Sequence, residues 1–308
     1  MSINWGIWSY SLPLLRPLAV QEEKKPFRKG FLIGNKRNNI WFFGEAAPLS
    51  GIHNIDHKDV FKELHSWIKD PDRDRLKDLH SITQFAIESS MYDYFQAPAV
   101  PINGLCTNAD TLKDQYRSLK IKVGRSSIEK DLELISQLAL QNPQSTFRLD
   151  PNGLWSLNQT CQFWSSLQKI NLEHRIEYIE DPVNTPKDLH KITEIPIALD
   201  QQIDTKWLDL PSLKAIIIKP SVQGGVSGVK RWQEQGRNKN IKVILSSTFE
   251  TSIGIGRILQ LATPQFFHGL GTLSWFAQDI CTPIVQENDL LFPPHTPPQP
   301  IHFVQREA

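Results

Sequence analysis

From about residue 98 onward, short apolar segments alternate with segments whose apolar residues recur at helical intervals. The apolar segments predict eight strands, at residues 100–106, 119–123, 146–150, 176–180, 197–200, 215–219, 243–247 and 266–270. Helices are expected at 127–140, 157–168 and 226–235, whereas 201–213 is expected to be mostly loop. Eight apolar strands joined largely by helices predict a closed parallel α/β barrel. The alternative, an open doubly wound sheet, usually has a glycine-rich turn after its first strand, and Gly104-Leu-Cys-Thr does not provide one.

The first part of the chain orders its elements differently. Residues 5–15 and 29–45 read as extended, with turn residues at Gly34-Asn35 and at 37–39, and helices are expected at 58–69 and 81–95. Strands grouped before helices predict an α+β domain over residues 1–97, followed by the barrel domain over 98–284. The tail, 285–308, is rich in proline from 292 to 300, so we expect it to be extended and to pack back on the first domain.

Composition excludes several classes of function. A formal net charge of +1 over 308 residues provides no field that would attract nucleic acid or an anionic membrane. No run of about 18 apolar residues could span a bilayer, and the N-terminus has no signal-peptide pattern. The scattered cysteines, Cys106, Cys161 and Cys281, have neither metal-ligand spacing nor a disulfide framework. We therefore expect a cytoplasmic protein; the sequence does not specify its oligomeric state.

Five consecutive predicted strands end in a charged residue: Lys122, Asp150, Glu180, Asp200 and Lys219. The active sites of parallel barrels lie at this end of the strands. Three converging carboxylates would repel one another unless a cation lay between them, and oxygen ligands without His or Cys favour Mg²⁺ over zinc. Each acid could instead cap a helix or form a loop ion pair, but the regular placement on successive strands favours a metal site.

The lysines predict the type of reaction. Lys120 and Lys122 share one strand face, so a like charge, burial and the metal would each lower the pKa of Lys122, as a general base requires. Lys219 approaches from the opposite side. Such an arrangement suits abstraction of a proton next to a carboxylate. The alternative for the Lys120–Lys122 pair is an exposed strand end.

These residues, in this order, resemble the enolase superfamily, and the Lys-x-Lys pattern with a lysine on the sixth strand resembles its muconate-lactonising branch. Within that branch the chain is most similar to the o-succinylbenzoate synthase family of menaquinone and phylloquinone biosynthesis. The segments that carry the resemblance are 44–51, 147–152, 179–182, 218–220, 246–254 and 269–272. The resemblance implies a modified TIM barrel, (β/α)7β, with an N-terminal α+β capping domain.

The resemblance also implies an activity: syn dehydration of 2-succinyl-6-hydroxy-2,4-cyclohexadiene-1-carboxylate to 2-succinylbenzoate by a hydro-lyase. Asp150, Glu180 and Asp200 would bind Mg²⁺, with Mn²⁺ as a substitute. Lys122 would remove the proton and return it to the leaving hydroxyl, and Lys219 would stabilise the enediolate. The small carboxylate substrate is expected to contact Lys120, Arg148, Asn152, Ser246, Ser247, Thr248 and Gly269.

Several of these substrate contacts have alternatives. Arg148 could form a structural ion pair beneath the site, and hydroxyls near residues 251–254 could cap the helix that follows the seventh strand instead of binding substrate. Backbone N–H groups at 251–254 would suit a substrate carboxylate. Residues 18–31 should form part of a mobile lid. Gln201-Gln202 departs from the family's Glu-Ser and puts the surroundings of Asp200 in doubt, and Gly224-Gly225 is only a weak phosphate-binding pattern.

Other activities share this scaffold. N-acylamino acid racemase, dipeptide epimerase and muconate cycloisomerase can use the same two lysines. A dipeptide epimerase should have Asp-x-Asp on the eighth strand, where this chain has His268-Gly-Leu-Gly-Thr. A barrel that binds a ligand without turnover is disfavoured because all three acids and both lysines are present.

Overall fold

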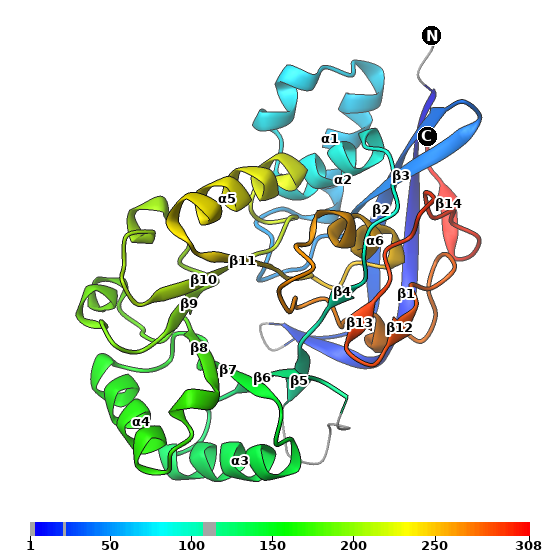
Figure 1. Cartoon of the computed structure of the whole chain (residues 1–308). Coiled ribbons are helices and arrows are strands. Elements are labelled where there is room, and N and C mark those ends of the chain that lie inside the picture. The colour runs from blue at the N-terminus through cyan, green and yellow to red at the C-terminus, as the bar shows by residue number, and fades with distance from the viewer. Residues whose placement is uncertain (1–3, 21–22, 107–114) are drawn as a thin grey trace.

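The computed structural model describes residues 4–20, 23–106 and 115–308 (Figure 1). The chain begins with an antiparallel sheet of β1 (Asn4–Val20), β2 (Glu23–Arg37) and β3 (Ile40–Ala46), to which β14 (Val304–Arg306) adds at the edge of β1. Asn38 and Asn39, both with positive φ, form the tight turn between β2 and β3, so the predicted turn at 37–39 is confirmed.

The turn predicted at Gly34-Asn35 is wrong, because both residues lie inside β2. Gly34 pairs with Gly6 on one side and with Phe43 on the other. The glycine leaves room for aromatic rings, since a Cβ there would lie 2.7 Å from Trp8 and 2.9 Å from Trp41. The glycine therefore marks close side-chain packing across the sheet, not a change of direction.

Helices α1 (His57–Lys69) and α2 (Ser81–Met91) follow, separated by a 3-10 turn, η1 (Arg73–Asp78). Helix α1 begins where the Asp56 side chain accepts from the Asp59 N–H. Helix α2 ends before the predicted residue 95. The guanidinium of Arg257 donates to the carbonyl oxygens of Ser89, Tyr92 and Asp93, and so satisfies acceptors that a longer helix would have used itself.

The second part of the chain contains a seven-stranded parallel sheet in the order β11-β10-β9-β8-β7-β6-β5. Its strands are β5 (Gly104–Cys106), β6 (Ser118–Lys122), β7 (Thr146–Asp150), β8 (Ile176–Glu180), β9 (Ile197–Leu199), β10 (Leu213–Ile218) and β11 (Lys242–Leu245). The predicted eighth strand, 266–270, does not form an extended ladder. Single parallel bridges instead join Gly269 to Ser246 and His268 to Ile102, and these close the ring.

Helices cover the outside of this ring: α3 (Ile128–Gln141), α4 (Leu157–Lys169), α5 (Gly225–Lys239) and α6 (Ser252–Leu261). Only 3-10 turns join β8 to β9 and β9 to β10, namely η4 (Pro186–Lys191) and η5 (Thr205–Trp207), which confirms the expectation for 201–213. The main core lies between the helices and the outer faces of the strands, where residues such as Leu119, Phe147 and Leu138 are fully buried. The fold is thus the predicted α/β class.

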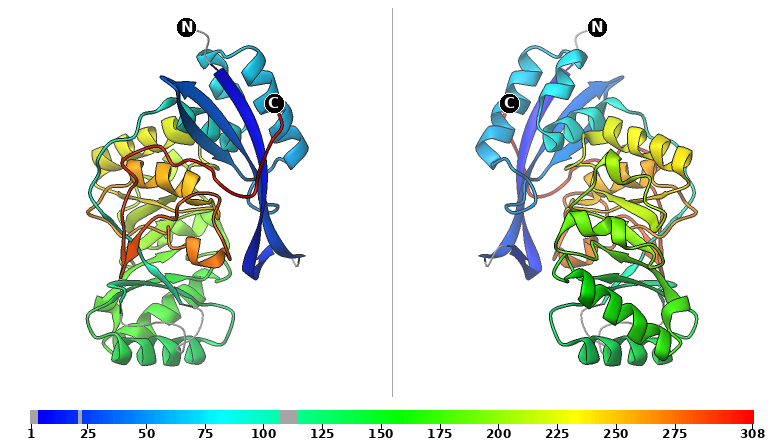
Figure 2. Two further views of the ribbon diagram at one scale, coloured as in Figure 1. Left: turned by 90° about the vertical axis from the view of Figure 1, so that its right-hand side faces the viewer. Right: turned by 90° about the vertical axis from the view of Figure 1, so that its left-hand side faces the viewer.

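The antiparallel sheet stands beside the barrel, as Figure 2 shows from two sides. Two carboxylates fix the contact: Glu88 of α2 accepts from the N–H of Ser227 at the start of α5, and Glu45 of β3 accepts from the N–H of Gly254 at the start of α6. Gly224-Gly225, the weak phosphate pattern, thus lies at a helix start where the Ser227 N–H already donates to Glu88. The tail pairs β13 (Leu290–Leu291) with β12 (Gln286–Glu287) and with β4 (Val100–Pro101) before β14 reaches β1. In the described part of the chain no helix could cross a membrane.

Candidate active site

The charged residues that end the predicted strands lie at one rim of the barrel. Lys122, Asp150 and Glu180 are the last residues of β6, β7 and β8, and Asp200 and Lys219 directly follow β9 and β10. Because these strands are neighbours in the sheet, the two lysines flank the three acids. The acids of β7 and β8 are almost completely buried, with 1 % and 2 % of their surface exposed.

The acids and lysines are paired directly. Lys120 Nζ lies 2.8 Å from Asp150 Oδ2 and 2.5 Å from Glu180 Oε1, and Lys122 Nζ lies 2.6 Å from the same Asp150 oxygen. Lys219 Nζ contacts Asp200 Oδ1. The Lys122 ammonium also donates to Asn152 Oδ1 at 3.0 Å. An ammonium group thus bridges two acids on adjacent strands.

The pKa values of this cluster reflect burial and mutual charge. Burial opposes the charged form of Lys120, but the carboxylates of Glu180, Asp150 and Asp200 hold the pKa of its ammonium well above the usual range. Burial, together with the nearby Asp150 and Asp200, raises the pKa of Glu180 to about 8, although Lys120 acts in the opposite direction. For Asp150, burial is outweighed by Lys120 and Lys122, so that its pKa falls well below the usual range. The cluster therefore needs positive charge to keep its carboxylates ionised.

Each of the three rim acids contacts a lysine. Within residues 4–20, 23–106 and 115–308, no group of three His, Cys, Asp or Glu side chains is gathered closely enough to hold a metal ion. The oxygens of Asp150 and Glu180 point at the Lys120 ammonium instead, which occupies the position of a shared cation. All three carboxylates are hard oxygen donors at one rim, so their chemistry fits a divalent cation such as Mg²⁺.

Asp181 positions the third acid of the rim. Its carboxylate accepts from the N–H groups of Asp200 and Gln201, at 3.0 and 2.9 Å. Burial raises the pKa of Asp181 to about 6. These bonds use only the backbone of Gln201, so the departure at 201–202 leaves the support of Asp200 intact. Asp181 was not predicted as a site residue; its φ of 45° places it in the turn after β8, and its buried carboxylate has this positioning role.

Arg148 lies below the rim and is 2 % exposed. Its guanidinium donates to Glu177 Oε2 at 3.0 and 3.1 Å, to Asn103 Oδ1 at 3.2 Å and to the carbonyl oxygen of Phe267 at 2.9 Å. Protein acceptors therefore engage the three guanidinium nitrogens. This arrangement favours the structural alternative over substrate binding.

The hydroxyls after β11 form bonds with neighbouring loops. Ser247 Oγ lies 2.7 Å from Thr272 Oγ1, and Ser246 Oγ lies 3.4 Å from the carbonyl oxygen of Gly269. At Gly269 a Cβ would come within 2.9 Å of Ser246 Oγ, which explains the glycine at this crossing. Thr248 Oγ1 donates to Glu250 Oε1 at 2.5 Å.

The start of α6 differs from the expected carboxylate site. Its N–H groups at Thr251 and Gly254 donate to Glu45, and that of Ser252 donates to Asp279. The bound carboxylates thus belong to the protein, and the prediction of a substrate carboxylate at 251–254 is wrong. The alternative of a helix cap is confirmed for Thr251, whose side chain accepts from the Ile253 N–H.

Besides Glu45 and Glu88, Arg28 and His53 also reach the barrel, and neither was predicted as a site residue. Arg28 of β2, 2 % exposed, donates to the carbonyl oxygens of Thr248 and Phe249 and also to that of Pro48. His53 Nε2 lies 3.2 Å from Ser221 Oγ, which in turn donates to Glu250. Arg28 lies within the predicted lid segment 18–31, and His53 follows the segment 44–51 closely. Residues 21–22 of the expected lid lie outside the described residues.

Comparison with known proteins identifies the family and the fold. Residues 105–297 match the family model described as enolase C-terminal domain-like. The o-succinylbenzoate synthase of Vibrio cholerae (strain ATCC 39315) is 26 % identical over 310 residues, covering 90 % of this chain and 91 % of that protein. In structure, the L-Ala-D/L-Glu epimerase of Bacillus subtilis is similar with a TM-score of 0.82 at 18 % identity, covering 97 % and 98 % of the two chains. The o-succinylbenzoate synthase of Thermosynechococcus elongatus, with Mg in its active site, gives a TM-score of 0.72 at 21 % identity, covering 91 % and 95 %.

Proposed function

Because the chain belongs to the enolase C-terminal domain-like family, we propose that it is a hydro-lyase that forms 2-succinylbenzoate, as o-succinylbenzoate synthases do. The substrate would be 2-succinyl-6-hydroxy-2,4-cyclohexadiene-1-carboxylate, and the pathway that of menaquinone or phylloquinone. One observation carries the proposal: Lys122 and Lys219 flank three acids on consecutive strand ends. The whole-length relatives named for this reaction support the choice of substrate.

Asp150, Glu180 and Asp200 would hold the metal. Bound there, Mg²⁺ would supply positive charge for the substrate carboxylate and would compete with the lysine ammonium groups for the three acids. The bridging of Asp150 and Glu180 by Lys120 supports the fit, since these two buried carboxylates already share one cation. Asp181 would keep the backbone of Asp200 in place.

Lys122 would act as the base. In its neutral form it takes the proton from the carbon next to the carboxylate, and the C–H electrons move into the enediolate. The enediolate then expels the hydroxyl group, Lys122 returns its proton to that oxygen, and water leaves from the same face. Asn152, which accepts from Lys122 Nζ at 3.0 Å, would aim the amine. The Lys219 ammonium would stabilise the enediolate charge from the other side.

The test follows the ultraviolet absorbance of the aromatic product. Purified protein with Mg²⁺ should convert the cyclohexadiene substrate, and chelation of the metal should stop conversion. A metal-loaded, folded protein that gives no product would contradict the proposal.

A racemase or epimerase is the second candidate, because a lysine on each side of the acids also suits removal and return of a proton on opposite faces. The similarity to the Bacillus subtilis epimerase supports testing it. Exchange of the α-proton of an N-acylamino acid in deuterated water would reveal this activity. His268-Gly-Leu-Gly-Thr, in place of Asp-x-Asp, remains an argument against dipeptides as substrates.

A further inference from the structure

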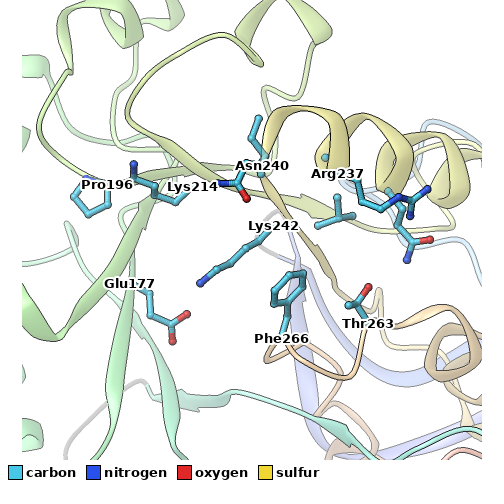
Figure 3. A pocket seen from close by; sticks show the side chains of 12 residues that line it. Glu177, Pro196, Lys214, Arg237, Asn240, Lys242, Thr263 and Phe266 are labelled. Carbon is cyan, nitrogen blue, oxygen red and sulfur yellow. The ribbon is translucent and has the colours of Figure 1, made fainter.

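A cavity lies at the end of the barrel opposite the acidic rim. Its volume is about 720 Å³, which falls within the range typical of small-molecule sites. Its wall comes from the first residues of β8, β10 and β11, the C-terminal turns of α5 and the loop after α6 (Figure 3). The cavity shares no residue with the proposed catalytic site, so a ligand bound in it would be independent of the proposed function.

Two charged residues of the wall sit at irregularities of the sheet. Between β7 and β8 the register passes from Phe147–Ile176 to Arg148–Tyr178, which leaves Glu177 as an extra residue. Between β9 and β10 the register likewise skips Lys214. Such bulges redirect a side chain and are over-represented at sheet edges, at the rims of barrels and next to active sites. Two bulges with charged residues on one wall are the first sign of a binding site.

The wall has excess positive charge. It contains Lys214, Arg237 and Lys242, and none of these three forms an ion pair with a carboxylate in the described part of the chain. The acid of the wall is Glu177, which is already paired with Arg148 and accepts from two hydroxyls as well. The cavity therefore favours an anion.

The rest of the wall is apolar and partly aromatic. Figure 3 shows the Lys242 side chain extending into the space between Glu177 and the ring of Phe266. Its Nζ lies 6.0 Å from the centre of that ring. Pro196 and Val243 add apolar surface on either side. A ligand could thus place a negative group at Lys242 and a flat apolar body against Phe266.

We propose that this cavity is a binding site for a small carboxylate with a planar apolar body, separate from the catalytic rim. Benzene-1,2-dicarboxylate (phthalate) is a suitable probe because it combines both features. The ring rests on Phe266, and the carboxylates engage Lys242 and Lys214. Inorganic phosphate lacks the apolar body and should bind at least about tenfold more weakly.

Isothermal titration calorimetry on the full chain tests this. Wild-type protein should bind phthalate at millimolar concentration or below, and Lys242→Ala should weaken binding at least about tenfold because a charge-assisted hydrogen bond is lost. Lys239→Ala is the matched control: Lys239 lies at the same end of α5 but pairs with Asp209, and should leave binding unchanged.

Three results would overturn the assignment: no binding of phthalate at millimolar concentration, equal binding by wild type and Lys242→Ala, or binding of phosphate as tight as that of phthalate. Phthalate held at the catalytic rim would give the second result. The substituted lysines are exposed, and thermal unfolding of each variant would show that it is folded.

Discussion

Because His268 is held neutral in the folded protein, the free energy of unfolding should decrease as the pH falls below 6.5. The side chain is fully buried where the barrel closes. Its Nδ1 accepts from the Leu245 N–H at 2.8 Å, so its proton is on Nε2, which donates to the carbonyl oxygen of Thr263 at 3.0 Å. A second proton would face the N–H of Leu245. Burial accordingly lowers the pKa of His268 from 6.5 to about 4.

The sign and size of the effect follow from linkage. The unfolded chain takes up a proton at His268 below pH 6.5, whereas the folded chain does so only near pH 4. The stability that this histidine contributes is therefore fully present above pH 6.5 and is lost as the pH falls from 6.5 to about 4. The pKa difference corresponds to about 3 kcal/mol, of which about 2.5 kcal/mol is lost by pH 4.5.

His268→Asn isolates this contribution. The amide oxygen can still accept from Leu245, but the bond to Thr263 is lost, so the variant should be about 1–3 kcal/mol less stable at pH 7.5. Because asparagine does not titrate, this deficit should shrink by about 2.5 kcal/mol at pH 4.5. Other groups, such as His53, whose pKa burial lowers to about 4, titrate in both proteins and cancel in the comparison.

Urea unfolding followed by tryptophan fluorescence, at several pH values from 7.5 to 4.5, measures the two curves. His295→Asn, at an exposed position in the tail, should run parallel to wild type. A deficit of His268→Asn that stays constant over this pH range would refute the assignment of a neutral, barrel-closing histidine.

Three further substitutions test the site and the domain contact. Lys122→Ala should lower the dehydration rate at least about 10²-fold in the absorbance assay, and a near wild-type rate would reject this residue as the base. Asp181→Asn removes one of the two carboxylate oxygens that accept from backbone N–H groups. The Mg²⁺ concentration needed for half-maximal activity should then rise about 10–100-fold, and an unchanged metal titration would contradict the positioning role of Asp181. Gly225→Ala places a Cβ 2.5 Å from Glu88 Oε2 at a φ of 67°, and the free energy of unfolding measured in urea should fall by about 2–4 kcal/mol. Gly153→Ala is the control, because Gly153 has the same φ but a Cβ there would have no atom closer than 3.7 Å; its loss should be only about 1–2 kcal/mol. Equal losses would exclude the steric contact with Glu88.

The rim residues could be predicted from sequence because each depends on a local pattern. A charged residue at the end of an apolar run, as in Ile216-Ile-Ile-Lys219, marks both the strand and its end. Helices with serine caps, such as α3 after Ser127, are equally local. The eighth strand was harder because a strand exists through its partners, and 266–270 keeps only single bridges. The domain boundary near residue 98 stays a prediction.

Contacts between distant segments could not be predicted in this way. Arg28 and Thr248 are 220 residues apart, and a lone arginine in a basic segment gives no sign that its guanidinium will meet a buried carbonyl oxygen. The N–H groups at the start of α6 looked available for substrate in the sequence, because nothing there shows that Glu45 occupies them. Equally, the pairing of each rim acid with a lysine depends on how far the lysine side chain reaches across the sheet. Lys120 of β6, for example, contacts Glu180 of β8, two strands away.

These distant contacts bear on the choice between dehydration and racemisation. Both reactions use the same rim, so the choice must lie in groups that orient the rest of the substrate. The segment after β11 is the expected contact, and its backbone at Thr248 and Phe249 is held by Arg28 of β2. Phe249 has a φ of 63°, a conformation that costs about 1 kcal/mol or more and persists only when its surroundings enforce it. Arg28→Met would remove these donors while keeping most of the bulk of the stem. If Arg28 holds this segment in place, the variant should have a higher KM for the cyclohexadiene substrate, while Lys122 still exchanges the α-proton of an N-acylamino acid. An equal loss of dehydration and of proton exchange would instead show that Arg28 supports only the stability of the fold.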